Sequence, residues 1–281
     1  MAGGALGDGM SLASPPQNDR LSRRVAAAFV LIPLVLGLTW AGGWSFAIMI
    51  AGFAGLLGWE WARLCGVLNV GPVGWLLPAG LALLMFVAAD NWFLPAAAGG
   101  AGLAIALLLL HTKRCGAQRA GWLALGVAAI LPAGLALLWL RTEAHGGMAL
   151  IFWLMLVVWV TDTGAYAVGR SIGGPLLAQR ISPSKTWAGL IGGLTAAFLA
   201  GGLAAMVLTG KAFYPAATAG LIIGVASGLG DLFESYLKRT FKVKDSGGLI
   251  PGHGGVMDRL DSLLAAAPVT AVLYLAGWQW L

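Results

Sequence analysis

Residues 231–261 read DLFESYLKRTFKVKDSGGLIPGHGGVMDRLD, and this stretch gathers five acidic side chains, five basic side chains and five glycines in a very apolar chain. Charged side chains are costly within a membrane, so a membrane protein that concentrates them marks a functional site. We therefore interpret residues 231–261 as the working part of the protein, and the apolar segments on both sides as its support.

The composition predicts an integral membrane protein. Of 281 residues, 59% are hydrophobic and only 10% are charged, whereas about 25% are charged in ordinary globular proteins. Apolar runs of about 20 residues, long enough to cross a hydrocarbon core of roughly 30 Å as helices, follow one another along the chain. Because the alternating pattern of membrane strands is absent, we predict an all-α, polytopic transmembrane helical bundle rather than a barrel.

We expect nine spans, grouped into a supporting part and a catalytic part. Residues 1–24 are predicted to be a disordered, basic N-terminal tail, residues 25–147 a transmembrane scaffold, and residues 148–281 a catalytic transmembrane domain whose spans form the active site. The expected spans are 25–41, 44–60, 73–89, 93–111, 121–140, 148–168, 187–209, 213–230 and 262–281.

The basic residues orient these spans. Fifteen of the 17 Lys and Arg residues fall on the side that carries the N-terminus, and only Arg141 and Lys211 fall on the other side. By the positive-inside rule the first side is cytoplasmic. We therefore expect a multi-pass protein of the bacterial inner (plasma) membrane, with residues 231–261 and the polar loop 170–186 facing the cytoplasm. Glu60, at the cytoplasmic end of the second span, is interpreted as an interfacial anchor.

Carboxylates recur at the cytoplasmic ends of the last four spans. Asp162 lies near the end of the sixth span, where a charge is costly and indicates function. If the eighth helix continues beyond its span, Asp231, Glu234 and Lys238 share one face at i, i+3 and i+7. Helix capping is an alternative explanation for either Asp258 or Asp261, but not for the whole set.

A second group of residues is typical of a phosphate site. Ser182 before Pro183 is interpreted as a helix start, with Lys185 and Thr186 near its positive end. An ordinary interfacial cap explains this segment equally well. Basic side chains and a loop of glycines whose amides can approach a ligand come from residues 231–261: Arg239, Lys244, Gly254, Gly255 and Arg259.

This mixture of residues predicts phosphate chemistry at a membrane surface. Carboxylates without a His or Cys cluster are hard oxygen ligands suited to Mg²⁺, with a second cation left open. Lysines, arginines and glycine amides can neutralise the remaining phosphate charge, which is what phosphoryl or nucleotidyl transfer requires. The two cysteines, Cys65 and Cys115, fall beside basic loops, and we expect neither a disulfide nor a Cys metal site.

The spacing of these residues closely resembles the signature of the phosphatidate cytidylyltransferase (CDP-diglyceride synthase) family. The resemblance covers about Asp162 to the C-terminus, and this chain has Ser184 and Ala188 where members often have Lys and Glu. The matching runs are Ser235-Tyr236-Leu237-Lys238-Arg239, Lys244-Asp245-Ser246-Gly247, Ile250-Pro251, His253-Gly254-Gly255 and Met257-Asp258-Arg259-Leu260-Asp261.

The resemblance implies a reaction that joins CTP to phosphatidic acid and gives CDP-diacylglycerol and pyrophosphate, with Mg²⁺. It implies metal binding by Asp231 and Asp258, with Asp162, Glu234 and Asp261 as further ligands. Lys238, Arg239 and Lys244 would bind CTP phosphates, and Ser182, Lys185 and Arg259 either the lipid phosphate or the triphosphate. His253 would either donate to the leaving pyrophosphate or order the glycine loop.

The expected partners are CTP, phosphatidic acid and membrane lipid, without nucleic acid, and a homodimer is left open. The lipid would enter sideways from the cytoplasmic leaflet, among spans six to nine. Three alternatives were weighed. A CDP-alcohol phosphatidyltransferase would carry a D-G-x-x-A-R string, which is missing. A CTP-dependent polyprenol kinase uses similar chemistry. A secondary transporter would place its charges at the midplane, whereas here they lie at helix ends.

Overall fold

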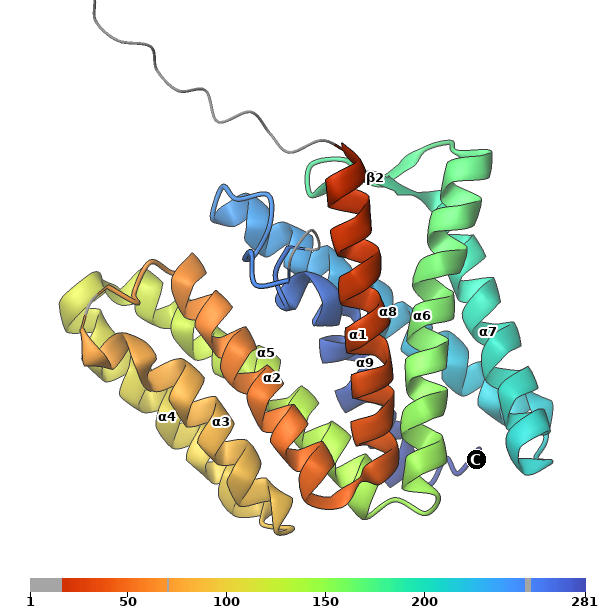
Figure 1. The fold of residues 1–281 in the computed structure, drawn as a ribbon, viewed down its shortest axis with the longest axis horizontal. Coiled ribbons are helices and arrows are strands. Elements are labelled where there is room, and N and C mark those ends of the chain that lie inside the picture. Colours follow the sequence, from red (N-terminus) through yellow and green to blue (C-terminus); the bar gives the residue numbers. More distant parts are fainter. Residues whose placement is uncertain (1–16, 70, 251–253) are drawn as a thin grey trace, which may run out of the picture.

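The structure, a computed structural model, describes residues 17–69, 71–250 and 254–281, with side chains from residue 28 onward. Within these residues the chain forms nine α-helices, one short 3₁₀ helix and two short strands (Figure 1). The elements are α1 (Gln17–Ala41), α2 (Gly43–Leu64), η1 (Pro72–Trp75), α3 (Leu76–Ala89), α4 (Phe93–Cys115), α5 (Ala117–Thr142), α6 (Gly147–Ile172), β1 (Leu176–Ala178), β2 (Ser182–Thr186), α7 (Trp187–Thr209), α8 (Phe213–Thr240) and α9 (Met257–Leu275).

Each helix of the described residues coincides with one of the nine expected spans, so the predicted helical membrane bundle is confirmed. Seven of the helices, α2 to α8 with η1 extending α3, are long and apolar enough to cross a membrane. In α1 the apolar part is shorter, Ala28–Ala41. The protein is therefore a multi-pass membrane protein.

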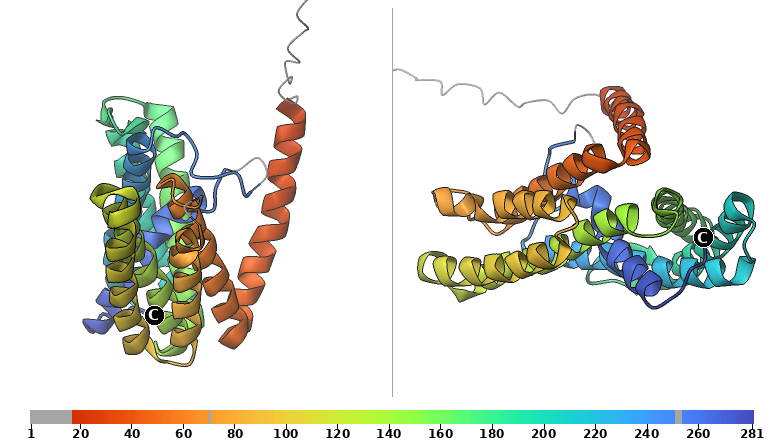
Figure 2. Two further views of the ribbon diagram at one scale, coloured as in Figure 1. Left: turned by 90° about the vertical axis from the view of Figure 1, so that its left-hand side faces the viewer. Right: turned by 90° about the horizontal axis from the view of Figure 1, so that it is seen from below.

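The helices form two groups that α9 joins. Helices α2 to α5 pack together on one side, and α6, α7 and α8 on the other (Figure 1). Helix α9 packs against both α5 and α8 and so links the groups. Helix α1 makes its contacts with α2 and α6, and diverges from the other helices along its length (Figure 2). The charged ends of α8 and α9 consequently lie where the two groups meet.

Polar contacts tie the ends opposite the β-hairpin together. Lys211, between α7 and α8, donates to the carbonyl of Leu281 at 2.6 Å, and Tyr274 donates to the carbonyl of His145 at 3.2 Å. The start of α1, the β-hairpin and the loop after α8 lie at the other end of the bundle (Figure 1). The start of α1 and residue Leu281 therefore lie at opposite ends of the bundle, as expected for an odd number of membrane crossings.

Glycines bring α7 close enough to α6 to place the hairpin over the bundle. A Cβ on Gly189 would lie 2.8 Å from the Ala165 carbonyl oxygen, and a Cβ on Gly193 would lie 2.8 Å from the Thr161 carbonyl oxygen. Any larger residue would push these backbones apart. The start of α7 is thereby held beside the end of α6 that carries Asp162.

Most helix boundaries differ by a few residues from those predicted, and those of α1, α8 and α9 differ most. Helix α1 begins at Gln17, within the predicted tail, because no proline or glycine interrupts residues 17–32; the rest of that tail, residues 1–16, lies outside the described residues. Helix α9 spans Met257–Leu275 instead of 262–281. Its charged first turn is helical because Glu60 caps it, as described below.

The interpretation of Ser182 as a helix start is wrong. Residues Ser182–Thr186 form strand β2, which pairs antiparallel with β1 so that Leu176 faces Thr186 and Ala178 faces Ser182. The proline that follows Ser182 fits an exposed edge strand as readily as a first helical turn. The helix begins at Trp187, and its N-cap is Thr186, whose hydroxyl accepts from the Gly189 amide at 3.0 Å.

Candidate active site

Three carboxylates converge where α8 meets α9. Asp231 and Glu234 lie one turn apart on α8, and Asp261 approaches them from α9; one oxygen of each lies within 4.8 Å of the others. This meeting depends on Gly230, because a Cβ there would lie 2.4 Å from the Asp261 carbonyl oxygen. The predicted stripe on a continuous α8 is confirmed by the helix, which runs to Thr240.

The three carboxylates fit a divalent cation. Close carboxylate oxygens repel one another unless a positive charge lies between them, and Mg²⁺ prefers such oxygen ligands. The Glu234 side chain is 4% exposed, and its Oε1 atom has no hydrogen-bond partner among the described residues. A buried carboxylate that has an oxygen without a hydrogen-bond partner and lies close to two other carboxylates is suited to be a metal ligand.

Two lysines neutralise part of this negative charge. Lys185, at the end of β2, pairs with Asp231 at 2.5 Å. Lys238 lies between two buried carboxylates, 2.6 Å from Glu234 and 2.9 Å from Asp258. The structure thus brings together Lys185 from the hairpin and Lys238 from the end of α8, which are separated in the sequence by two membrane-spanning helices, α7 and α8.

Asp258 organises the loop before α9. Its Oδ2 atom accepts from the Ser246 amide at 3.1 Å, the Ser246 hydroxyl at 3.0 Å and the Gly255 amide at 2.8 Å. Although burial alone raises the pKa of a carboxyl group, the Lys238 ammonium and the Gly255 amide hold the pKa of Asp258 well below its usual range. Oδ1 pairs with Lys238, and Oδ2 accepts the three hydrogen bonds from the loop. The described contacts of Asp258 therefore stabilise the loop before α9.

Asp162 lies next to the cluster, on α6. Its Oδ1 atom accepts from the Ser262 hydroxyl at 3.4 Å, and Ser262 directly follows Asp261 on α9. The predicted meeting of Asp162 with the C-terminal carboxylates is therefore seen, although Asp162 is not among the three that lie within 4.8 Å of one another.

Glu60 is the residue of this site that sequence reasoning missed. It is fully buried, and the interpretation as an interfacial anchor is wrong. Its carboxylate accepts from the Val256 amide at 2.8 Å and the Met257 amide at 2.7 Å, and Ser246 donates to it at 3.3 Å. Glu60 on α2 thus caps the first turn of α9 from the far side of the loop.

The glycines of the loop before α9 allow Ser246 and Glu60 to approach its backbone closely. A Cβ on Gly255 would lie 2.1 Å from the Ser246 hydroxyl and 2.6 Å from Glu60, and Gly254 has a φ of +85°. The Gly255 amide is bonded to Asp258 rather than turned toward open space. His253, predicted to act on pyrophosphate or order the loop, lies outside the described residues.

The other predicted phosphate ligands differ in their contacts and exposure. Arg239 donates to the Ile181 carbonyl at 3.3 Å and joins α8 to the hairpin. Lys244 and Arg259 are exposed, whereas Ser182 is buried. These predicted phosphate ligands therefore lie at different depths in the structure.

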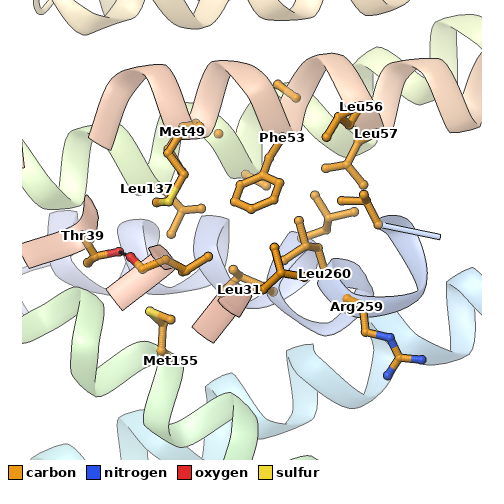
Figure 3. A pocket seen from close by; sticks show the side chains of 18 of the residues that line it. Leu31, Thr39, Met49, Phe53, Leu56, Leu57, Leu137, Met155, Arg259 and Leu260 are labelled. Carbon is orange, nitrogen blue, oxygen red and sulfur yellow. Dashed lines mark hydrogen bonds between the residues drawn. The ribbon is translucent and has the colours of Figure 1, made fainter. Parts of the chain in front are cut away.

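An apolar pocket of about 590 Å³ opens beside this cluster, between α1, α2, α5, α6 and α9. Arg259 and Leu260 lie at one end of it, and Thr39 and Leu137 at the other (Figure 3). Asp162 is its only lining carboxylate within the described residues. The carboxylate cluster and an apolar cavity are thereby adjacent.

Comparison with known proteins agrees with this geometry. Residues 22–276 match the profile of the cytidylyltransferase family. The phosphatidate cytidylyltransferase of Pseudomonas aeruginosa is 40% identical over 275 residues, covering 92% of this chain and 98% of that protein. Those of Brucella suis and Haemophilus influenzae are 38% and 33% identical, covering 92% and 90% of this chain and 94% and 98% of their own lengths. The chain therefore belongs to the cytidylyltransferase family, as the resemblance of its C-terminal half predicts.

Proposed function

We propose that this protein transfers the cytidylyl group of CTP to phosphatidic acid, which gives CDP-diacylglycerol and pyrophosphate. The observation that carries the proposal is that two sites lie side by side. One is the carboxylate cluster with its two lysines, and the other is the apolar pocket lined by Asp162 and Arg259. The first suits a nucleoside triphosphate with its metal, and the second suits a lipid tail.

The bond changes require little from the protein besides placement and charge. A phosphate oxygen of the lipid attacks the α-phosphorus of CTP, and the bond to the bridging oxygen of pyrophosphate breaks. Because the second pKa of a phosphate monoester is about 6, the attacking group is already largely ionised at neutral pH. No general base is needed, which agrees with a site of carboxylates and lysines.

Asp231, Glu234 and Asp261 are the residues that would hold Mg²⁺. When bound there, Mg²⁺ would supply positive charge for the phosphate oxygens of CTP. Lys185 and Lys238 already lie against these carboxylates, so both ammonium groups are within reach of phosphates at the same place. Arg259, at the mouth of the pocket, is the cation nearest to where a lipid phosphate would sit. A second cation beside the first is left open.

We also propose that the site faces the cytoplasm across a bacterial inner membrane, where CTP is present. The support is the bias of 15 to 2 in basic residues between the two sides. A homodimer remains a prediction about the oligomeric state, and light scattering from detergent-solubilised protein measures it directly.

The deciding assay uses purified protein with phosphatidic acid, Mg²⁺ and CTP labelled at either the α- or the γ-phosphate. Cytidylyl transfer puts the α label, and never the γ label, into the lipid fraction. A lipid kinase with CTP as donor gives the opposite pattern. Uptake of a solute into proteoliposomes with no nucleotide turnover would support a transporter and would contradict the proposal.

Replacing Lys238 with Met is expected to lower turnover by about 100-fold, because an ammonium that serves both carboxylates and phosphates is lost. Its removal also leaves two nearly buried carboxylates without their cation, which lowers thermal stability. Initial rates and thermal unfolding of purified protein measure the two effects. The same substitution at Lys113, an exposed residue in the last turn of α4, is the control. Turnover like that of the control would remove Lys238 from the site.

A further inference from the structure

We propose that the apolar pocket between α1 and the rest of the bundle binds one acyl chain of the lipid substrate, with α1 as its outer wall. The proposal rests on the proposed function and adds to it where the lipid tail lies. It also differs from the expectation that the lipid enters among spans six to nine, because α1, α2 and α5 line the pocket as well.

The shape and lining of the pocket fit an acyl chain. Its volume of about 590 Å³ falls in the range of roughly 300–1,000 Å³ that is usual for ligand pockets. It extends from Arg259 to Thr39, with Phe53 in its middle and Met49 beside Leu137, toward the Thr39 end (Figure 3). Even Thr39 offers no free donor to the cavity, because its hydroxyl donates to the Val35 carbonyl at 2.7 Å.

The polar end of the pocket is joined to the carboxylate cluster. Asp162 lines the pocket and accepts from Ser262, the residue after Asp261. Arg259 lines the same end, one turn before Ser262 on α9. A chain bound in the pocket therefore places its anionic headgroup at the end that carries the Arg259 guanidinium, beside the site where CTP is proposed to bind. Continuity and charge both favour the lipid substrate as occupant.

Helix α1 is anchored at the end of the pocket far from Arg259. Arg141 donates to the Thr39 carbonyl at 3.1 Å and to the Trp40 carbonyl at 3.2 Å. Directly after α1, Gly42 and Gly43 have φ values of +67° and +50°, a conformation that favours glycine. Near the mouth, α1 stands away from the other helices (Figure 2). Helix α1 is thus anchored at the Thr39 end of the pocket and diverges from the other helices toward the Arg259 end.

Narrowing the pocket toward its Thr39 end, far from Arg259, tests the proposal. Met49→Trp puts a larger side chain into the cavity, and Met206→Trp, at an exposed position of α7 outside it, is the control. We expect Met49→Trp to lower kcat/KM for dioleoyl phosphatidic acid by about tenfold relative to the control, since apolar pockets discriminate chain size by such factors. Turnover of dihexanoyl phosphatidic acid, whose chains end before Met49, should be unchanged. Equal losses for both lipids, or for neither, would overturn the proposal.

A second measurement does not depend on turnover. Wild-type protein is photolabelled with phosphatidic acid that carries a diazirine at the end of one acyl chain, and labelled peptides are mapped. Labels on residues 28–39 or 46–57 are expected. Labels confined to α3, α4 or α7 would contradict the site, and equal labelling by phosphatidylcholine of the same chain would show a general membrane-lipid site instead. If wild-type protein forms no CDP-diacylglycerol from either lipid, the proposed function fails independently of these labels.

Discussion

Asp261→Asn is expected to lower the rate of cytidylyl transfer by about 100-fold or more at low Mg²⁺, with partial recovery as Mg²⁺ rises. Asp261 is the one carboxylate that α9 contributes to the cluster, and Asp231 and Glu234 come from α8. Asparagine keeps the size of the side chain and an oxygen for the Ser262 amide, which donates to Asp261 at 2.8 Å. The change therefore removes a negative charge while it leaves the helix contact intact.

Initial rates over a range of Mg²⁺ concentrations, with CTP and phosphatidic acid saturating, make the measurement. Asp90→Asn is the matched control, because Asp90 is an exposed carboxylate at the end of α3, outside the cluster. If Asp261→Asn had the Mg²⁺ dependence and the maximal rate of the control, Asp261 would not bind the metal. The cluster would then be a charge network that Lys185 and Lys238 stabilise by themselves.

Local features of the site could be predicted from the sequence. Asp231, Glu234 and Lys238 share a face because 3.6 residues make a helical turn, and nothing between them breaks the helix. Seven of the nine described helices, α2 to α8, follow from their apolar length. The contact of Lys185 with Asp231 is consistent with the expected topology, which places the hairpin and the end of α8 on the same side.

Features that depend on packing could not be predicted. A carboxylate at the end of an apolar span has the same sequence pattern whether it anchors at an interface, as predicted for Glu60, or caps another helix. Its partners Val256 and Met257 lie 196 and 197 residues away. Helices that are apolar all round likewise give no indication of which faces meet, so the pocket beneath α1 was not foreseen.

The start of α7 shows how one local signal can be misread. Serine followed by proline is typical of a helix N-terminus, but the helix begins five residues after Ser182 because β1 pairs with those residues. Thr186 then provides the cap. Pairing with a neighbouring strand outweighs an intrinsic preference, which is worth only about 1 kcal/mol.

Glu60→Gln is expected to lower maximal turnover by at least about tenfold and to raise the Mg²⁺ concentration needed for half-maximal rate. In this proposal Glu60 acts indirectly: it fixes the start of α9, and α9 carries Arg259 and Asp261. Its two oxygens each accept one backbone amide at the start of α9, and a glutamine would turn a donor toward one of them. A buried amide left without an acceptor costs about 1–3 kcal/mol. The first turn of α9 would then shift or fray, and Arg259 and Asp261 would move with it.

The Mg²⁺ concentration needed for half-maximal rate distinguishes a positioning role of Glu60 from a purely stabilising one. A purely structural role would reduce the yield or the thermal stability of the protein, while molecules that remain folded would keep the wild-type Mg²⁺ dependence. Rates are therefore normalised to folded protein from size-exclusion chromatography, and Glu143→Gln, at an exposed site after α5, is the control. An unchanged Mg²⁺ requirement in folded Glu60→Gln protein would limit Glu60 to the fold. A raised requirement would show that a residue of the N-terminal half, through two backbone amides of α9, sets the place of a carboxylate in the active site.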